Sequence, residues 1–372
     1  MEKEQNIKYI KVRQYLHEHA ELSGKERKTA NYIRELLLET KPVKIISNVG
    51  GHGVVAVYDS GTAGKNVMIR ADIDALPIEE TGELAYRSRN RGVSHKCGHD
   101  GHIVILLSLA IWLSEHIKEL KGKVFLLFQP AEETAQGARA ILADKKFISL
   151  KPDYIFGLHN LPGFPLNSLI IREGVFAMAS AGLKFRFTGK TSHAAHPENG
   201  ISPLPAMLKL IAGLNKLPLT TIIHLRLGDE AFGTSPGEGE VMVTFRAVSD
   251  EMLQKQVEKS ENLAQKLAVK YGLLLEMERV EEFAATVNDA EAFGILERAA
   301  LESKLPIIRP PEPFRWTEDF SFYSQKYKTV FFGLGSGENC PQLHNPDYDF
   351  PDELIENGRE IFAKIVEEVM KA

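Results

Sequence analysis

Apolar positions along the first half of the chain show two kinds of pattern. A spacing of three and four positions predicts helices, and short continuous apolar runs predict strands. Residues 7–38 carry apolar side chains three and four positions apart, which is typical of two amphipathic helices, the second starting near Ser23-Gly24. A longer apolar run over residues 103–113 predicts a buried helix, and residues 135–142 predict another. Short apolar runs predict strands over residues 54–58, 66–70, 124–128 and 154–160. Apolar strands between helices are typical of a sheet covered on both faces, so the pattern predicts an α/β fold.

The pattern changes near Met178, where alternating strands and charged amphipathic helices begin. The expected elements are a strand over 183–188, a helix over 203–214, paired strands over 221–227 and 240–247, a helix over 250–271 and a strand over 273–280. The order β-α-β-β-α-β is the ferredoxin-like signature. We therefore predict an inserted α+β domain over residues 178–288, and a first domain made of residues 1–177 and 289–372.

The returning part of the first domain shows a further set of elements. They are a helix over 291–303, a helix that starts within 316–322, a strand over 329–334 and a C-terminal helix over 353–370. Thr317 or Asp319 would cap the second of these helices.

Composition narrows the class of protein. The chain has 372 residues, of which 44% are hydrophobic and 26% charged, as in ordinary globular proteins. A formal net charge of -5 gives no electrostatic reason to expect nucleic acid or an anionic membrane as partner. Two cysteines cannot form a disulfide framework, and residues 1–6 are charged and lack an apolar signal core. We expect a cytoplasmic protein.

Residues 95–102, His-Lys-Cys-Gly-His-Asp-Gly-His, carry the densest chemistry of the chain. Thiolate, imidazole and carboxylate groups gathered directly before a buried helix favour a divalent transition metal. A redox loop would more naturally contain Cys-x-x-Cys. The alternative is a polar loop that caps the helix and contains incidental histidines.

Acidic and imidazole groups also follow three predicted strands. Asp72 and Asp74 follow the strand over 66–70, Glu132 and Glu133 follow the strand over 124–128, and His159 ends the strand over 154–160. Open α/β sheets bind ligands at such strand ends. One glutamate of the pair could bind a metal while the other takes a proton from water. The alternatives are an Asx turn for the aspartates and an acidic first helical turn for the glutamates.

Five stretches occur in order: residues 70–77, 97–102, 129–133, 157–160 and 343–346. Together they resemble the M20 metallopeptidase family, and most closely its amidohydrolase subfamily, which includes hippurate hydrolases, auxin-conjugate hydrolases and N-acetyldiaminopimelate deacetylases. The resemblance runs from about Ile10 to the C-terminus. It implies a mixed-sheet, zinc-peptidase-like catalytic domain with an inserted ferredoxin-like domain that acts as a lid and forms a homodimer.

The resemblance also implies the roles of single residues. Glu132 matches the general base, Asp74 the acid that orients a ligand, and His193 the inserted-domain histidine that steadies the oxyanion, usually of the partner subunit. The implied ligands of two divalent metal ions are Cys97, His99, Glu133, His159 and His344.

Three positions depart from the family pattern, and none is an implied metal ligand. Ala20 replaces the proline of His-x-x-Pro-Glu, Glu198 replaces a histidine, and Ser202 replaces an aspartate. These departures bear on substrate preference. Residues 17–21 themselves have the pattern of a solvated turn, and Cys340 is expected to pack rather than to bind metal.

The expected reaction is hydrolysis of the amide bond of N-acyl amino acids or similar small amides. A hydroxide bridging two ions would attack, and Glu132 would carry the proton from the water to the departing nitrogen. The ions could be zinc, manganese, cobalt or nickel, since thiolate favours the softest of these while imidazole and carboxylate suit all.

Three alternatives remain open from the sequence. A dipeptidase or carboxypeptidase would use the same centre with a different pocket. A non-catalytic metal-binding scaffold would have no need of a free Glu132 beside a ligand. A redox protein would require Cys97 and Cys340 in contact, and would leave His99 and His344 without a role.

Overall fold

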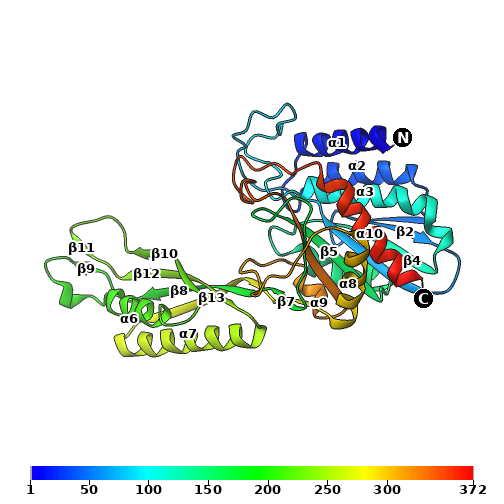
Figure 1. Ribbon diagram of the computed structural model, residues 1–372. Helices are drawn as coiled ribbons and strands as arrows, with labels where there is room; N and C mark the ends of the chain where they lie inside the picture. The colour runs from blue at the N-terminus through cyan, green and yellow to red at the C-terminus, as the bar shows by residue number, and fades with distance from the viewer. Residues whose placement is uncertain (1, 372) are drawn as a thin grey trace. The chain divides into compact units, whose positions relative to one another are not determined.

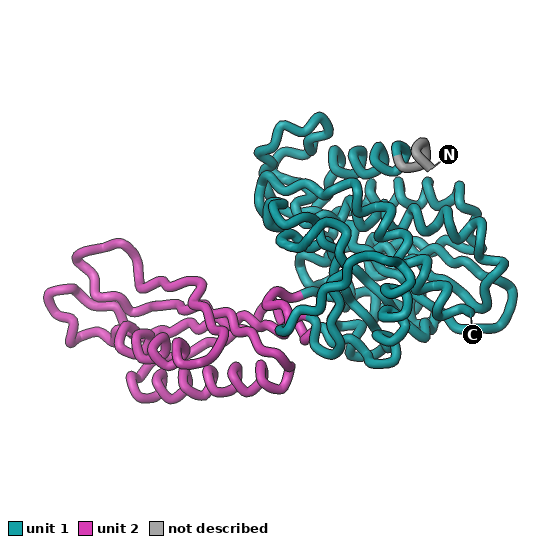
Figure 2. The backbone as a smooth tube through the Cα atoms, in the orientation of Figure 1, with its two compact units in different colours: residues 1–176, 286–312, 318–372 teal, residues 177–285, 313–317 magenta. Residues whose placement is uncertain are grey.

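The computed structural model describes residues 2–371, which divide into two compact units (Figure 2). Unit 1 comprises residues 1–176, 286–312 and 318–372, and unit 2 comprises residues 177–285 and 313–317. Residues 313–317 join unit 2 through contacts such as the Met178 N–H that donates to the Phe314 carbonyl at 2.9 Å, whereas the sequence-based boundaries left them in the first domain. That the two parts are separate domains, over 1–177 with 289–372 and over 178–288, stays a prediction.

Unit 1 is built on one mixed sheet, which confirms the predicted α/β class (Figure 1). Its eight strands lie in the order β1 (Lys44–Val49), β2 (Gly53–Asp59), β4 (Gly122–Gln129), β3 (Lys65–Asp72), β5 (Tyr154–Leu161), β16 (Lys328–Gly335), β6 (Leu169–Ile170) and β15 (Ile307–Ile308).

The four central strands run in the same direction. β3 pairs in parallel with both β4 and β5, and β16 pairs in parallel with β5. Their carboxyl ends therefore lie along one edge of the sheet, where open α/β sheets bind ligands. Nearly all their residues are buried, as expected for strands covered on both faces.

Helices cover the sheet of unit 1. They are α1 (Glu2–Glu18), α2 (Arg27–Glu39), α3 (His99–His116), η1 (Ile117–Glu119), α4 (Gly137–Ala143), α5 (Lys145–Ile148), α8 (Ala290–Ser303), α9 (Ser321–Ser324) and α10 (Leu354–Met370). α3 lies at the centre of this layer and contacts α1, α2, α10 and β3.

α3 and η1 together, over His99–Glu119, are long and apolar enough to cross a membrane by length and composition alone. Within unit 1, however, 72% of this apolar window is buried. The apolar character of α3 is therefore accounted for by its place in the core.

Unit 2 has the predicted β-α-β-β-α-β order around a four-stranded antiparallel sheet (Figure 1). The sheet order is β10 (Thr220–Leu227), β12 (Glu238–Ala247), β8 (Ala179–Thr188) and β13 (Leu274–Phe283), and the helices are α6 (Leu204–Leu214) and α7 (Asp250–Tyr271). Alternate residues of β12, from Val241 to Ala247, are buried, because the two helices cover only one face. A small extension carries β9 (Ser192–His193), η2 (Pro197–Asn199) and β11 (Thr234–Ser235).

Several elements differ from the sequence-based prediction. The strands β1, β6, β9, β11 and β15, and the pair β7 (Gly174–Ala177) and β14 (Thr286–Asn288), were not predicted. Most are two to four residues long, too short to show a period, and β1 is a half-exposed edge strand with a mixed pattern. The predicted cap near residue 317 was wrong: α9 begins only at Ser321, and Asp319 instead accepts the Ala138 N–H of α4 at 2.8 Å.

Candidate functional site

Side chains from three strand ends and two loops meet at one edge of the unit 1 sheet. Donor atoms that lie within 4.8 Å of one another form three overlapping groups: Cys97, His99 and His159; Cys97, Glu133 and His344; and His99, Glu132 and Glu133. The structure therefore brings together all five side chains that the sequence predicted as ligands, with Glu132 among them.

A left-handed glycine places the first two of these side chains. Gly98 has φ 91° and lies between Cys97 and His99, the first residue of α3. A Cβ at this position would lie 2.7 Å from the Asn160 side chain, so the close approach of the loop to β5 requires glycine as well. Cys97 and His99 thus project from opposite ends of one tight turn.

The two buried histidines present the same ring nitrogen. His99 Nδ1 donates to the Asp74 carbonyl at 2.9 Å, and His159 Nδ1 donates to the Asn160 carbonyl at 2.8 Å. With Nδ1 held in this way, Nε2 is the ring nitrogen that each histidine presents to the cluster, and His159 Nε2 lies 3.4 Å from Cys97 Sγ. Holding one nitrogen on a carbonyl is how proteins orient histidine for a metal.

Asp74 connects several of these groups. Its Oδ2 accepts the Ser23 hydroxyl at 2.7 Å and the Glu133 N–H at 3.0 Å, while its Oδ1 lies 3.3 Å from His99 Nδ1. Burial opposes its charge, but the hydrogen bonds from His99 and Ser23 lower the pKa of Asp74. Asp74 is thus an anion that orients one candidate ligand and anchors the backbone of another.

The two glutamates follow β4 on a strained turn. Ala131 has φ 54°, a region unfavourable for a residue with a Cβ, and its N–H donates to Glu26 at 2.9 Å. The turn directs both carboxyl groups to the same cluster. Burial, followed by the neighbouring acids Glu318 and Glu133, raises the pKa of Glu132 well above its ordinary value.

His344 comes from a separate loop before α10. It has φ 66°, and its N–H donates to the Lys96 carbonyl at 2.8 Å. Its Nε2 lies 3.6 Å from Glu133 Oε2, and its side chain is 53% exposed. It is the candidate ligand most open to solvent among the five.

The donor set fits divalent metal ions. Among the described residues, His99 Nε2 and Glu133 Oε1 are buried polar atoms with no hydrogen-bond partner. Although burial disfavours the charged ring, Asp72, Asp74 and Glu133 raise the pKa of His99 to about 10. Burial raises the pKa of Glu133 to about 7. A cation would neutralise the buried acids and would bind the nitrogen and oxygen atoms that have no hydrogen-bond partner. This combination of side chains is therefore typical of a cation site.

His193 lies in unit 2 and is not part of these groups. It is exposed on β9, where its backbone pairs with Thr234 of β11, and its ring accepts the Ala195 N–H at 3.0 Å. The oxyanion role of His193 stays a prediction.

The expectation of a solvated turn near His17 was wrong. His17 is fully buried at the end of α1, with Nδ1 2.9 Å from Asp100 and Nε2 2.9 Å from Glu80. Glu80 also accepts Lys96 Nζ at 2.6 Å, and Arg13 reaches Asp100 at 3.1 Å. These buried charges brace the loop that carries Cys97 and His99, and no local sequence period reveals them.

A second buried array lies next to the candidate ligands. Asp72 accepts Arg70 Nη1 at 2.6 Å and His102 Nδ1 at 2.6 Å. His102 Nε2 lies 2.5 Å from Asn160 Oδ1 and 3.3 Å from the Asn160 backbone nitrogen, so both ring nitrogens of His102 are in hydrogen-bond contact. Asp72 and His102 therefore support the site through hydrogen bonds, although their donor atoms also lie near His99.

Cys340 is half-buried and packs against the core cluster of unit 1, as expected. Both cysteines are free thiols, and the candidate metal groups contain only Cys97. Burial, and then the charges of Glu133 and Glu132, raise the pKa of Cys97 well above its ordinary value.

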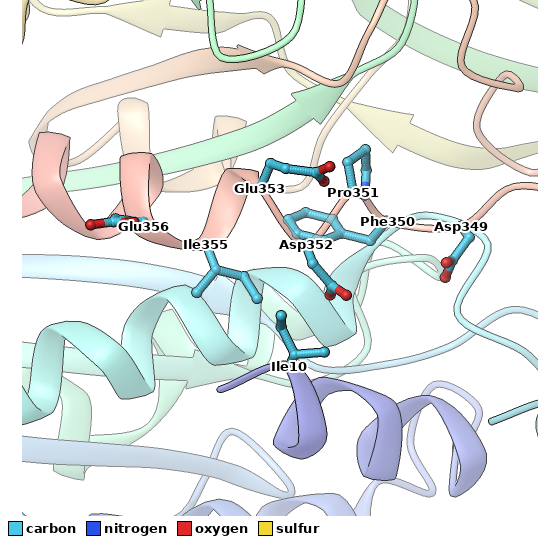
Figure 3. Close-up of a pocket in the computed structure, with 8 residues that line it drawn as sticks. All are labelled: Ile10, Asp349, Phe350, Pro351, Asp352, Glu353, Ile355 and Glu356. Carbon is cyan, nitrogen blue, oxygen red and sulfur yellow. The ribbon is translucent and has the colours of Figure 1, made fainter. Parts of the chain in front are cut away.

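A cavity of about 660 Å³ lies elsewhere in unit 1, between α1 and the start of α10 (Figure 3). Ile10 faces Ile355 and Asp352 across it, and the rest of its lining comes from residues 349–356. None of its lining residues belongs to the candidate metal groups, and Asp349 and Asp352 pair with Arg13. We assign it no role in the chemistry.

The chain is similar to proteins of known family in both sequence and structure. The family model described as "Peptidase family M20/M25/M40" matches residues 68–368. The chain is 29% identical to a hippurate hydrolase of Campylobacter jejuni, over 98% of this chain and 97% of the relative. It is 30% identical to an N-acetylcysteine deacetylase of Bacillus subtilis, over 97% of this chain and 96% of the relative. Among solved structures, a dinuclear metal-binding peptidase of the M20 family from Bacillus subtilis matches with a TM-score of 0.87 at 29% identity, covering 98% of each chain.

Proposed function

The chain belongs to peptidase family M20/M25/M40 and is a metal-dependent amidohydrolase of that family, and from this premise we propose that it hydrolyses the amide bond of N-acyl amino acids. The observation that carries the proposal is Glu132, a buried carboxyl adjacent in sequence to Glu133 and within the same cluster of donor atoms. A protein that only stores or senses a metal has no need of this extra acid.

We propose that two divalent ions are held by Cys97, His99, Glu133, His159 and His344. The three overlapping groups supply more donors than one ion uses, and Cys97 occurs in two of them. When bound, the ions would supply an activated water and a Lewis acid for the substrate carbonyl.

Glu132 is the proposed general base and acid. It would take a proton from the attacking water and return it to the departing nitrogen. Asp74 keeps His99 oriented through Nδ1 and fixes the Glu133 backbone, so the neighbouring acids have distinct roles.

His193 is proposed to donate a hydrogen bond to the oxyanion. Its ring is exposed in unit 2, so it is available to a site outside its own sheet. We also propose that it acts within a homodimer, in which one subunit supplies the histidine to the other.

An apolar surface of unit 2 supports the dimer. β10 is an edge strand of its sheet, and edge strands are ready partners for another chain. α6 packs beside it, and the exposed apolar side chains of this region, here called the β10 patch, are Ile201, Leu204, Leu208, Ile223 and Leu225. We propose that a second copy of the chain covers the β10 patch.

We also propose a cytoplasmic location, as expected from the sequence.

The reaction is tested with a panel of N-acetyl and N-benzoyl amino acids and simple dipeptides. Protein stripped of metal and refilled with zinc, manganese or cobalt should hydrolyse the N-acyl compounds. Glu132→Gln should lower kcat by about 10²- to 10⁴-fold while bound metal stays unchanged. A preference for dipeptides would show that the substrates are dipeptides and not N-acyl amino acids. Bound metal without turnover of any amide would contradict the proposed reaction.

The dimer is tested by light scattering on the purified chain. The pair Leu208→Lys and Ile223→Lys should convert a dimer to a monomer. Val269→Lys, at a site 72% exposed on α7, is the matched control and should leave the mass unchanged. A monomeric wild type would contradict the dimer.

Subunit mixing then tests the route of His193. Glu132→Gln and His193→Ala protomers, each impaired alone, should regain activity when co-assembled, because one active site in the pair would hold both intact residues. No recovery after verified exchange would mean that His193 serves its own chain or has no role.

A further inference from the structure

A second, smaller pocket of unit 1 lies between α2 and the turn that joins β1 to β2. Its volume is about 240 Å³, and none of its lining residues belongs to the candidate metal groups. α2 contacts both β1 and β2, so the pocket is formed by elements that follow one another along the chain. Ala30 and Val54 form its apolar part. Polar side chains form the rest of this pocket, here called the α2 pocket: Arg27, Asn31, Ser47, Asn48 and His52.

The polar side chains of the α2 pocket have no partner within the described part of the chain. No hydrogen bond or ion pair joins any of these five side chains to another described residue. Arg27 and Asn31 are four positions apart on α2, so they lie on the same face of the helix. A guanidinium has five N–H donors in one plane, and the amides, the hydroxyl and the imidazole add others. The pocket therefore gathers donors that the protein itself does not satisfy.

No acid lines the α2 pocket, and the two acids beside its wall accept backbone N–H groups. Glu26 precedes Arg27 but is fully buried, and it accepts the Ala131 N–H at 2.9 Å. Asp144 accepts the Gly50 N–H at 2.9 Å. The positive charge of Arg27 is therefore not paired with a carboxylate of the described chain.

The backbone at the start of α2 does not supply the missing partner. Glu21 accepts the N–H groups of Lys28 and Thr29, at 2.8 and 2.9 Å. Recognition of a ligand in the α2 pocket would therefore depend on side chains, and not on free N–H groups of a helix end.

A bulge in β1 directs Asn48 away from the strand ladder. The register of β1 and β2 shifts between Ser47 and Val49, and Asn48 has φ 57°. Such a bulge leaves one residue unpaired and changes the direction of its side chain. Lys146 Nζ donates to the carbonyls of Ser47 and Asn48, at 3.0 and 2.9 Å. Lys146 thus stabilises the bulge and adds a second positive charge behind the wall of the pocket.

We propose that the α2 pocket binds a phosphate group, either as inorganic phosphate or as part of a small metabolite. Arg27 would pair with two phosphate oxygens, as guanidinium groups do with oxyanions. Asn31, Asn48 and His52 would donate to the remaining lone pairs. A carboxylate has only two oxygens, which the guanidinium alone can occupy, so donors on separate elements favour the anion with more oxygens.

The size of the pocket agrees with this ligand. At about 240 Å³ it is smaller than the roughly 300–1,000 Å³ of pockets for drug-sized ligands, so it suits a compact anion. The site goes beyond the proposed hydrolysis and does not depend on it, because the pocket and the candidate metal groups share no residue.

Titration calorimetry of the metal-loaded full chain with inorganic phosphate tests the site. The wild type should bind phosphate, and Arg27→Gln should weaken one binding event by about tenfold or more, since it removes a charged bidentate contact. His52→Ala should weaken the same event by about fivefold, as expected for one neutral hydrogen bond. Phosphate bound by the metal ions would be unaffected in both variants.

Arg34→Gln is the matched control. It removes the same charge from an exposed position of α2 that does not line the pocket, and it should bind phosphate as the wild type does. Equal losses in Arg27→Gln and Arg34→Gln would show a general effect of charge and would overturn the proposal. Phosphate binding that is absent from the wild type, or unchanged in Arg27→Gln, would also overturn it.

Two further probes identify the source of the anion. If sn-glycerol 3-phosphate binds more tightly than inorganic phosphate and depends on Arg27, the ligand is a phosphorylated metabolite. If it binds no more tightly, the ligand is free phosphate. Acetate that binds as tightly as phosphate, with the same dependence on Arg27, would contradict the assignment of a phosphate group.

Thermal unfolding gives a second readout that needs neither heat of binding nor turnover. A ligand that binds only the folded chain raises its Tm. At equal ionic strength, replacing chloride by phosphate should raise the Tm of the wild type and of Arg34→Gln more than that of Arg27→Gln. Equal rises in all three proteins would contradict the site, whereas a wild type without amidase activity would contradict only the proposed function.

Discussion

The two units use charged side chains in opposite ways. In unit 1, Arg13, Arg70 and Lys96 are fully buried, and each is paired with acids. In unit 2, charged pairs such as Arg186 with Glu240 lie on the open face of the sheet, where Arg186 is 46% exposed. The buried charges of unit 1 fix the segments around the candidate metal site, whereas the charges of unit 2 lie on a surface that another molecule could contact.

The largest expected effect on stability comes from breaking the buried array. Arg70→Met removes the partner of three acids, Asp72, Glu318 and Asp319. It should destabilise unit 1 by about 3–5 kcal/mol, because the acids remain buried without a cation. Arg186→Met is the matched change in unit 2 and should cost less than about 1 kcal/mol. Urea unfolding followed by tryptophan fluorescence measures both.

The chain allows each unit to be observed separately. Trp112 lies in α3 of unit 1, and Trp316 lies in the segment of unit 2 over residues 313–317. In Trp316→Phe protein the signal reports unit 1, and in Trp112→Phe protein it reports unit 2. Equal losses for Arg70→Met and Arg186→Met would contradict the distinction between the units.

A smaller and pH-dependent effect is expected at His17. Burial lowers the pKa of His17, but the hydrogen bonds that its ring donates to Asp100 and Glu80 outweigh this and raise the pKa to about 9. Since the folded value lies above the unfolded value of about 6.5, the stabilisation is complete below pH 6.5 and is lost as pH rises through 9. Wild type should exceed His17→Gln by on the order of 3 kcal/mol at pH 6.

That difference should shrink between pH 6.5 and 9, as measured by urea unfolding at each pH. His19→Gln, which alters a ring that contacts the Tyr15 carbonyl at the surface, is the control. A difference between wild type and His17→Gln that is constant with pH would show that the ring is not charged in the folded state.

The smallest effect on stability is expected at His193. Its side chain is exposed, so His193→Ala should change the free energy of unfolding by less than about 0.5 kcal/mol. If it stabilises the oxyanion, kcat should nevertheless fall by about 10²-fold, the scale of one lost donor. His196→Ala, three residues along, should leave kcat unchanged, and similar losses in both variants would argue against a specific role.

Features of the fold that depend on local patterns could be predicted from the sequence. Strand ends are visible as apolar runs followed by Asp72, Glu132 or His159, and parallel pairing brings such ends to one edge. The β-α-β-β-α-β order of unit 2 was predictable because its longer helices and strands have clear periods over eight or more residues.

The supporting charges were not visible in this way. His17 precedes Glu18 in the sequence and has the pattern of a solvated position. In the structure it is buried and makes hydrogen bonds with Asp100 and Glu80, which lie 83 and 63 positions away. Glu318 and Arg70 are 248 positions apart. Such contacts arise from tertiary packing, and no local period encodes them.

The most direct test of the central claim, that unit 1 carries a complete dinuclear metal centre, is the number of ions bound per chain. Protein dialysed against chelator and refilled with zinc should hold two ions by mass spectrometry of the metal, while His99→Ala and His344→Ala should hold fewer. His196→Ala in unit 2 should match wild type. Fewer than two ions in the wild type, or a full complement in both ligand variants, would contradict the account.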